Sequence, residues 1–179
     1  MRERIFRKLL RYSKEHAPVL FMRFQLQVLL NVTARAFGVP GKMIWYLPPK
    51  RALREYAIFT KNCMQFNRVN PRHLFRSAYA LGHHLRRITG FTDSRDLQHL
   101  IFFLYRNIRI TMSGSIPGEI TVSSCYFSRF YTPEQCSLMS YVDWGIIAGL
   151  CGGGNFKFTE RITESCGRCT AVFSNRKML

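Results

Sequence analysis

The feature that most constrains the fold is a change in the period of the apolar residues near residue 107. Before that point apolar residues recur every three to four positions, and we expect helices over 2–16, 18–37, 50–64, 73–88 and 93–107. After it, Ile108, Ile110 and Met112 alternate with other residues, as do Ile120 and Val122. A period of two predicts strands that pair as an antiparallel hairpin.

The second half of the chain returns once to a helix. Thr132 is the expected N-cap and Pro133 the first helical residue, and the helix continues to Leu150 before three glycines end it. Two strands over 156–162 and 169–173 finish the chain. The sequence therefore predicts an α+β fold, in which a mostly helical basic half, 1–107, packs on a small antiparallel sheet with one crossing helix, 108–179. A length of 179 residues suits one compact domain.

Charge is distributed unevenly along this sequence. The formal net charge is +17, and residues 1–90 contain 18 of the 27 basic residues but only 3 of the 10 acidic ones. This imbalance predicts an anionic partner for residues 1–90, either a membrane surface or a nucleic acid, with a solvated basic surface as the alternative. The N-terminus lacks the apolar core of a signal peptide, and Arg23 and Arg35 interrupt the most apolar segment. We therefore expect a cytoplasmic protein without a transmembrane segment.

Cysteines concentrate in the last third, where five of the six lie between 125 and 169. Cys166 and Cys169 form a CxxC, a spacing that suits a metal or a redox pair. We expect no cofactor, although zinc or iron could be held if Cys125 and Cys136 joined this pair. Buried thiols without a chemical role are the alternative.

The candidate catalytic residues are Cys125, Asp143 and Cys169. Cys125 ends a predicted strand just before a helix start, where backbone N–H groups and Arg129 would favour a thiolate. Asp143 lies within an otherwise apolar helix, and a buried carboxylate is costly unless it is paired. We expect its partner to be Arg161, Arg129 or a polar ligand.

The candidate substrate-binding residues are Arg161, Arg129 and Glu164. The planar guanidinium of Arg161 suits a carboxylate on the substrate. Glu160, Arg161 and Glu164 are expected on one strand, so that Glu160 and Arg161 face opposite sides of the sheet. A cross-strand ion pair at the surface is the alternative reading of these charges.

The order of these residues resembles the L-2-amino-thiazoline-4-carboxylic acid hydrolase family over 125–179. Cys125, Asp143, Arg161 and Cys169 fit that family's pattern, whereas Ser140 stands in place of its helical cysteine. The resemblance implies a hydrolase acting on a small cyclic amidine or amide as its small-molecule substrate. Cys125 or Cys169 would attack the C=N carbon, Asp143 would position water or move a proton, and Arg161 would bind a carboxylate.

Different features of the sequence suggest two other functions. The C-terminal strand with its cysteine is also similar to small-ligand domains of the 4-vinyl-reductase type, and this similarity implies a non-catalytic ligand-binding or sensor domain. The basic half suggests an adaptor for RNA or an anionic membrane, whose affinity would fall steeply with salt.

Overall fold

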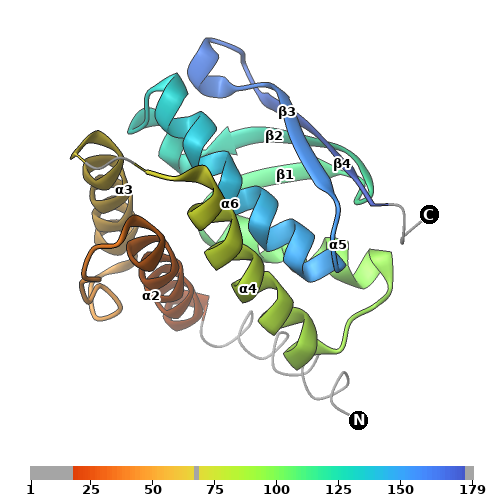
Figure 1. Ribbon diagram of the computed structural model, residues 1–179, viewed down its shortest axis with the longest axis horizontal. Coiled ribbons are helices and arrows are strands. Elements are labelled where there is room, and N and C mark those ends of the chain that lie inside the picture. Colours follow the sequence, from red (N-terminus) through yellow and green to blue (C-terminus); the bar gives the residue numbers. More distant parts are fainter. Residues whose placement is uncertain (1–17, 67–68, 176–179) are drawn as a thin grey trace.

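The computed structural model describes residues 18–66 and 69–175, and it confirms the α+β class (Figure 1). The helical part consists of α2 (Pro18–Phe37), α3 (Pro49–Phe66), α4 (Pro71–Thr89) and α5 (Ser94–Asn107). The second part contains β1 (Ile110–Gly114), β2 (Gly118–Cys125), the 3₁₀ turn η1 (Tyr126–Arg129), α6 (Pro133–Cys151), β3 (Asn155–Glu160), the 3₁₀ turn η2 (Ile162–Glu164) and β4 (Cys169–Ser174). The helix expected over 2–16 lies outside the described residues.

The four strands form one antiparallel sheet in the order β1-β2-β4-β3. Buried side chains alternate along its central strands, with Ile120 and Val122 on β2 and Ala171 and Phe173 on β4 turned toward the helices. Val172, between the last two, is 44% exposed. One face of the sheet therefore packs against helices and the other faces solvent, as is common for antiparallel sheets.

Helices α4 and α6 run side by side through the middle of the molecule and make the most extensive contact between any two of the described elements (Figure 1). Glycines allow this approach. A Cβ added at Gly145 would lie 2.6 Å from the Phe75 carbonyl oxygen, and a Cβ at Gly82 or Gly149 would collide with backbone atoms of the facing helix. The two helix backbones therefore touch directly, without side chains between them.

The helix ends follow local chemistry. Thr132 caps α6 as predicted, and it forms a capping box in which Thr132 and Gln135 each bond the other's backbone N–H. Gly152 ends that helix in the left-handed conformation. The helix predicted over 93–107 begins one residue later, at Ser94, because Asp93 is its N-cap and accepts from the Arg95 and Asp96 N–H groups.

The end of β3 also differs from the prediction. The strand stops at Glu160, and Glu164 belongs to the turn η2 rather than to a strand. The alternation argument for Glu160, Arg161 and Glu164 therefore does not apply. Instead, Arg161 pairs with Glu164 at 3.3 Å, and Glu160 pairs with Arg168 at 3.6 Å.

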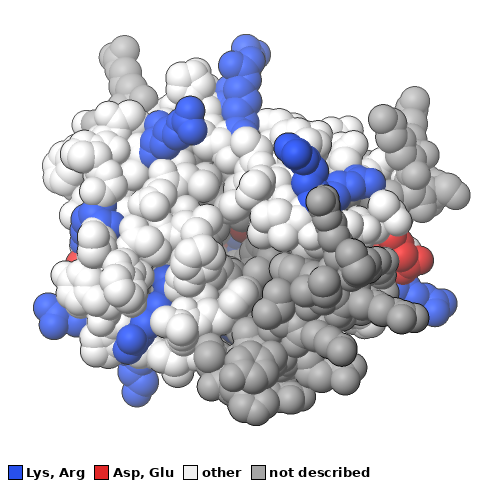
Figure 2. Space-filling view, turned by 90° about the horizontal axis from the view of Figure 1, so that it is seen from below, with Lys and Arg blue, Asp and Glu red and all other residues white. Residues whose placement is uncertain are grey.

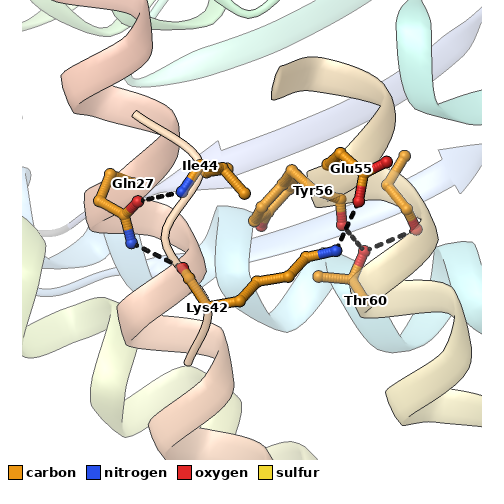
Figure 3. Close-up of polar contacts among 7 residues, drawn as sticks. Gln27, Lys42, Ile44, Glu55, Tyr56 and Thr60 are labelled. Atoms are coloured by element: carbon orange, nitrogen blue, oxygen red, sulfur yellow. Dashed lines mark hydrogen bonds and ion pairs between the residues drawn. The ribbon is translucent and has the colours of Figure 1, made fainter. Parts of the chain in front are cut away.

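The connection between α2 and α3 is held by the side chain of Gln27. Its amide donates to the Lys42 carbonyl at 3.0 Å and accepts from the Ile44 N–H at 2.7 Å (Figure 3). Lys42 also reaches Glu55 on α3 at 2.6 Å, and this ion pair lowers the pKa of Glu55. None of the described helices combines the length and the apolar character needed to cross a membrane.

Candidate functional site

An apolar cavity of 330 Å³ lies between the helices and the start of the sheet. Its walls come from α2, α3, α4, α5, β1, β2, η1 and α6, and most of its lining side chains are aliphatic or aromatic. Phe24 and Ile88 line it and are 65% and 47% exposed, so the cavity reaches the surface between α2 and α4. Among the described residues that line it, Asp143 alone carries a charge.

Asp143 projects into this cavity from the middle of α6. The Tyr105 hydroxyl on α5 donates to its Oδ1 at 2.8 Å. Burial raises the pKa of Asp143 from 3.8 to about 6, and the hydrogen bond from Tyr105 opposes part of that rise. Neither Arg161 nor Arg129, the partners expected from the sequence, forms an ion pair with Asp143 in the described part of the chain.

Three buried tyrosines, from three different segments, line the same space. Burial and the Asp143 charge raise the pKa of Tyr56 and of Tyr105, and burial raises that of Tyr131. The Tyr131 hydroxyl lies 2.6 Å from Thr60 Oγ1. Figure 3 shows how Thr60, one turn after Tyr56 on α3, also bonds the Tyr56 carbonyl. These phenols are neutral at physiological pH, and their hydroxyl groups place polar atoms in a mostly apolar cavity wall.

Two cysteines face the cavity. Cys125 ends β2 and Cys136 lies in the first turn of α6. Burial raises the pKa of the Cys125 thiol to about 12, against hydrogen bonds from the backbone at Phe127 and Ser128 that lower it. Burial likewise raises the pKa of Cys136. Both side chains are therefore neutral thiols at pH 7, which is unfavourable for nucleophilic attack.

The other predicted site residues lie outside the cavity. Cys169 is buried, its Sγ accepts from the Ile162 N–H at 3.3 Å, and burial raises its pKa. Arg161 pairs with Glu164 and lies 5.1 Å from the Phe158 ring. Arg129 is exposed and stacks on Tyr126, with its guanidinium carbon 3.9 Å from the ring centre. The structure thus brings Cys125 and Asp143 together and separates them from both arginines.

The cysteines do not form a metal site. Across 18–66 and 69–175, no three His, Cys, Asp or Glu side chains gather closely enough to hold an ion. Cys166 lies half-buried in the turn before β4, away from the cavity, and its Sγ is 3.9 Å from the Glu164 carbonyl. The four-thiol arrangement of Cys125, Cys136, Cys166 and Cys169 is therefore absent from the described fold.

The sequence reasoning missed Tyr105 and Gln25. Tyr105 is separated from Asp143 by 38 residues, and it looked like an ordinary inward-facing residue of a helix. Gln25 lies in the most apolar segment of the sequence and was not singled out as a candidate. A useful signal was available at each position, because a polar side chain on the buried face of a helix needs a partner.

Fold and site together define an α+β protein with an apolar cavity that contains one carboxylate. Comparisons with protein-family models, curated proteins and solved structures found no match to this chain.

Proposed function

We propose that this protein binds an apolar small molecule in the cavity and holds it largely shielded from water. The observation that carries the proposal is the cavity itself, which has 330 Å³ of space, an aliphatic and aromatic wall and an opening between α2 and α4. Its volume is at the lower end of the range of about 300–1,000 Å³ found for ligand pockets. At the roughly 30 Å³ that a water molecule occupies in the liquid, it has room for about eleven non-hydrogen atoms.

Binding without turnover is favoured over cysteine hydrolysis. Cys125 and Asp143 share the cavity, which is the geometry that a hydrolase needs. Against this, the thiol is protonated at neutral pH, and Arg161, the residue expected to bind a substrate carboxylate, lies outside. A cyclic amidine carrying a carboxylate would meet an apolar wall and the negative charge of Asp143. The proposed function therefore corresponds to the ligand-binding alternative of the sequence analysis.

The adaptor function for the basic half is a weaker proposal. On the face shown in Figure 2, Lys and Arg side chains are separated by wide areas of uncharged residues instead of gathering in one patch. Proteins that follow a phosphate backbone present a basic groove or stripe. An anionic partner for residues 1–90 stays a prediction, and a salt titration of binding to vesicles or RNA would test it.

Titration with straight-chain alcohols of six to twelve carbons tests the proposed function. Each buried methylene contributes about 0.8 kcal/mol, so the Kd should fall roughly fourfold per carbon until the cavity is full near ten carbons. At a hundred times its Kd, the best alcohol should stabilise the fold by about 2.7 kcal/mol, which raises the Tm by roughly 5–11 °C. Calorimetry and thermal unfolding measure the two quantities.

Cavity-filling variants provide the control. Val28→Phe on α2 and Met139→Trp on α6 place extra atoms in the cavity from two half-buried positions, and each should shorten the longest alcohol that binds. Val172→Phe adds the same kind of bulk on the exposed face of β4 and should leave binding unchanged. Absence of saturable binding, or equal binding by all three variants, would contradict the proposal.

A further inference from the structure

The cavity offers hydrogen-bond acceptors to a ligand but few free donors. Asp143 is the one charged residue among the described residues that line it, and a carboxylate can accept about four hydrogen bonds. In the described part of the chain, the Tyr105 hydroxyl supplies one of them. Acceptor capacity therefore remains on Asp143, and none of the described Lys or Arg side chains forms an ion pair with it.

Gln25 on α2 provides a second free acceptor in the same cavity. Its Nε2 donates to the Leu104 carbonyl at 2.8 Å, while its Oε1 is buried and has no hydrogen-bond partner among the described residues. The Leu104 contact fixes the orientation of the amide, because the flipped amide would bring two oxygens together. Leu104 directly precedes Tyr105 on α5, so the two acceptors are held by adjacent positions of one helix.

Three of the four hydroxyl donors among the described lining residues are already used within the protein. Tyr105 donates to Asp143, and Ser128 donates to the Cys125 carbonyl at 2.8 Å. Thr60 gives its hydrogen to backbone carbonyls, so the Tyr131 hydroxyl is the donor in their 2.6 Å contact. The fourth, Tyr56, is close to the side chain of Thr33, whose hydroxyl gives its own hydrogen to the Leu29 and Leu30 carbonyls. A ligand in this cavity thus finds acceptors to satisfy and must bring the donors itself.

From this imbalance we infer that the ligand is a lipophilic amine, whose protonated nitrogen pairs with Asp143 and whose hydrocarbon part fills the apolar cavity. The inference rests on the proposed function. An ammonium group has three donors and no acceptor, which matches a cavity with two free acceptors. It also supplies the positive charge that a buried carboxylate needs. The 330 Å³ volume fits an alkylamine of about ten carbons.

The net charge of the chain makes this inference sharply testable. At +17, the protein as a whole attracts anions and repels cations, so long-range electrostatics favour a fatty acid over an amine. A preference for the amine must therefore come from the cavity. We would measure the Kd of decylamine, decanol and decanoate at pH 7.5 by calorimetry, for the wild-type protein and for Asp143→Asn.

We expect decylamine to bind the wild-type protein at least tenfold more tightly than decanol, and decanoate to bind most weakly. Asp143→Asn should abolish the preference for the amine while decanol still binds. Glu119→Gln, which removes a carboxylate from an exposed position on β2, should keep the preference for decylamine over decanol. Tyr105→Phe, which retains the Asp143 charge, should also prefer the amine. Circular dichroism confirms that each variant is folded.

The pH dependence gives a second measurement. The described titratable groups around Asp143 come from five elements and are neutral from pH 5 to 8: Tyr105 on α5, Tyr56 on α3, Cys125 on β2, Cys136 on α6 and, from the sheet side, Cys169 on β4. Protonation of Asp143 should therefore dominate. Decylamine affinity should fall at least fivefold between pH 7.5 and pH 5, and decanol affinity should not.

The two proposals fail differently. If decanoate or decanol binds the wild-type protein at least as tightly as decylamine does, the inference of an amine ligand is wrong. The proposed function, binding of an apolar molecule in the cavity, would still stand. A preference for decylamine that persists in Asp143→Asn would also overturn the inference of an amine ligand. If none of the three compounds binds, the proposed function itself is wrong.

Discussion

Replacing Asp143 with Asn should stabilise the unliganded protein at neutral and alkaline pH. Asn has nearly the shape of a protonated Asp, and its carbonyl oxygen can accept the Tyr105 hydrogen bond. It carries no charge into the cavity. The substitution therefore removes the cost of a buried carboxylate while it keeps the local packing, which is the opposite of what loss of an ordinary structural residue does.

The magnitude follows from the pKa of Asp143, which is 3.8 for an ordinary Asp and about 6 in the folded protein. Because the folded state binds the Asp143 proton more tightly than the unfolded state does, protonation of Asp143 stabilises the wild-type fold. This contribution is fully present below pH 3.8 and is lost as the pH rises through 6. A difference of about 2 pKa units corresponds to about 3 kcal/mol. Asp143→Asn should thus be more stable than wild type by about 3 kcal/mol at pH 8, and by less than about 1 kcal/mol at pH 4.

Urea unfolding of both proteins at pH 4, 6 and 8 measures this difference. Other titrating groups contribute equally to the two proteins, so they cancel in the comparison. Glu119→Gln is the matched control, since a surface substitution of this kind changes stability by about 0.5 kcal/mol or less. If Asp143→Asn were destabilised at pH 8, or if its advantage did not change with pH, Asp143 would not be a desolvated carboxylate facing the cavity.

Further predictions concern the helix pair and the cavity thiol. Gly145→Ala should lower the free energy of unfolding by about 1–3 kcal/mol because of overpacking against α4, although helix propensity alone would raise it by about 1 kcal/mol. Gly167→Ala, where an added Cβ meets open space, should change it little; equal effects in urea unfolding would refute the close helix contact. Iodoacetamide at pH 8 should label Cys125 in the folded protein far more slowly than in urea, because its thiol pKa is raised to about 12. Peptide mass spectrometry measures this labelling, and rapid modification of folded Cys125 would instead favour a nucleophilic role.

Much of the fold was predictable from short-range signals. The helical period, the Thr132-Pro133 start and the glycine stop at 152 are local features, and they located α6 to within a residue at each end. Alternation located the four strands. The errors were also local: Asp93 is the N-cap of α5 and not its first helical residue, and β3 ended before Arg161 because the chain turns there into η2.

The candidate site was only partly predictable, because its defining property is space that side chains do not fill. That space depends on how eight elements pack around it, and no short segment of the sequence encodes it. Asp143 was recognisable as a carboxylate on an apolar helix. Its partner Tyr105 was not, since many aromatic residues occupy equivalent inward positions and only the packing of α5 on α6 selects one of them.

The close contact of α4 with α6 has a consequence for how this protein can vary. Gly82, Gly145 and Gly149 each have room for a hydrogen atom only, so selection should keep all three unchanged. Cavity-facing positions on α6 such as Met139 and Val142 are not among the atoms nearest these glycines, so their side chains can change in size without disturbing the backbone contact. The contact between α4 and α6 and the lining of the cavity thus depend on separate residues. Evolution or design can therefore alter which ligand fits the cavity without changing the packing of the two helices.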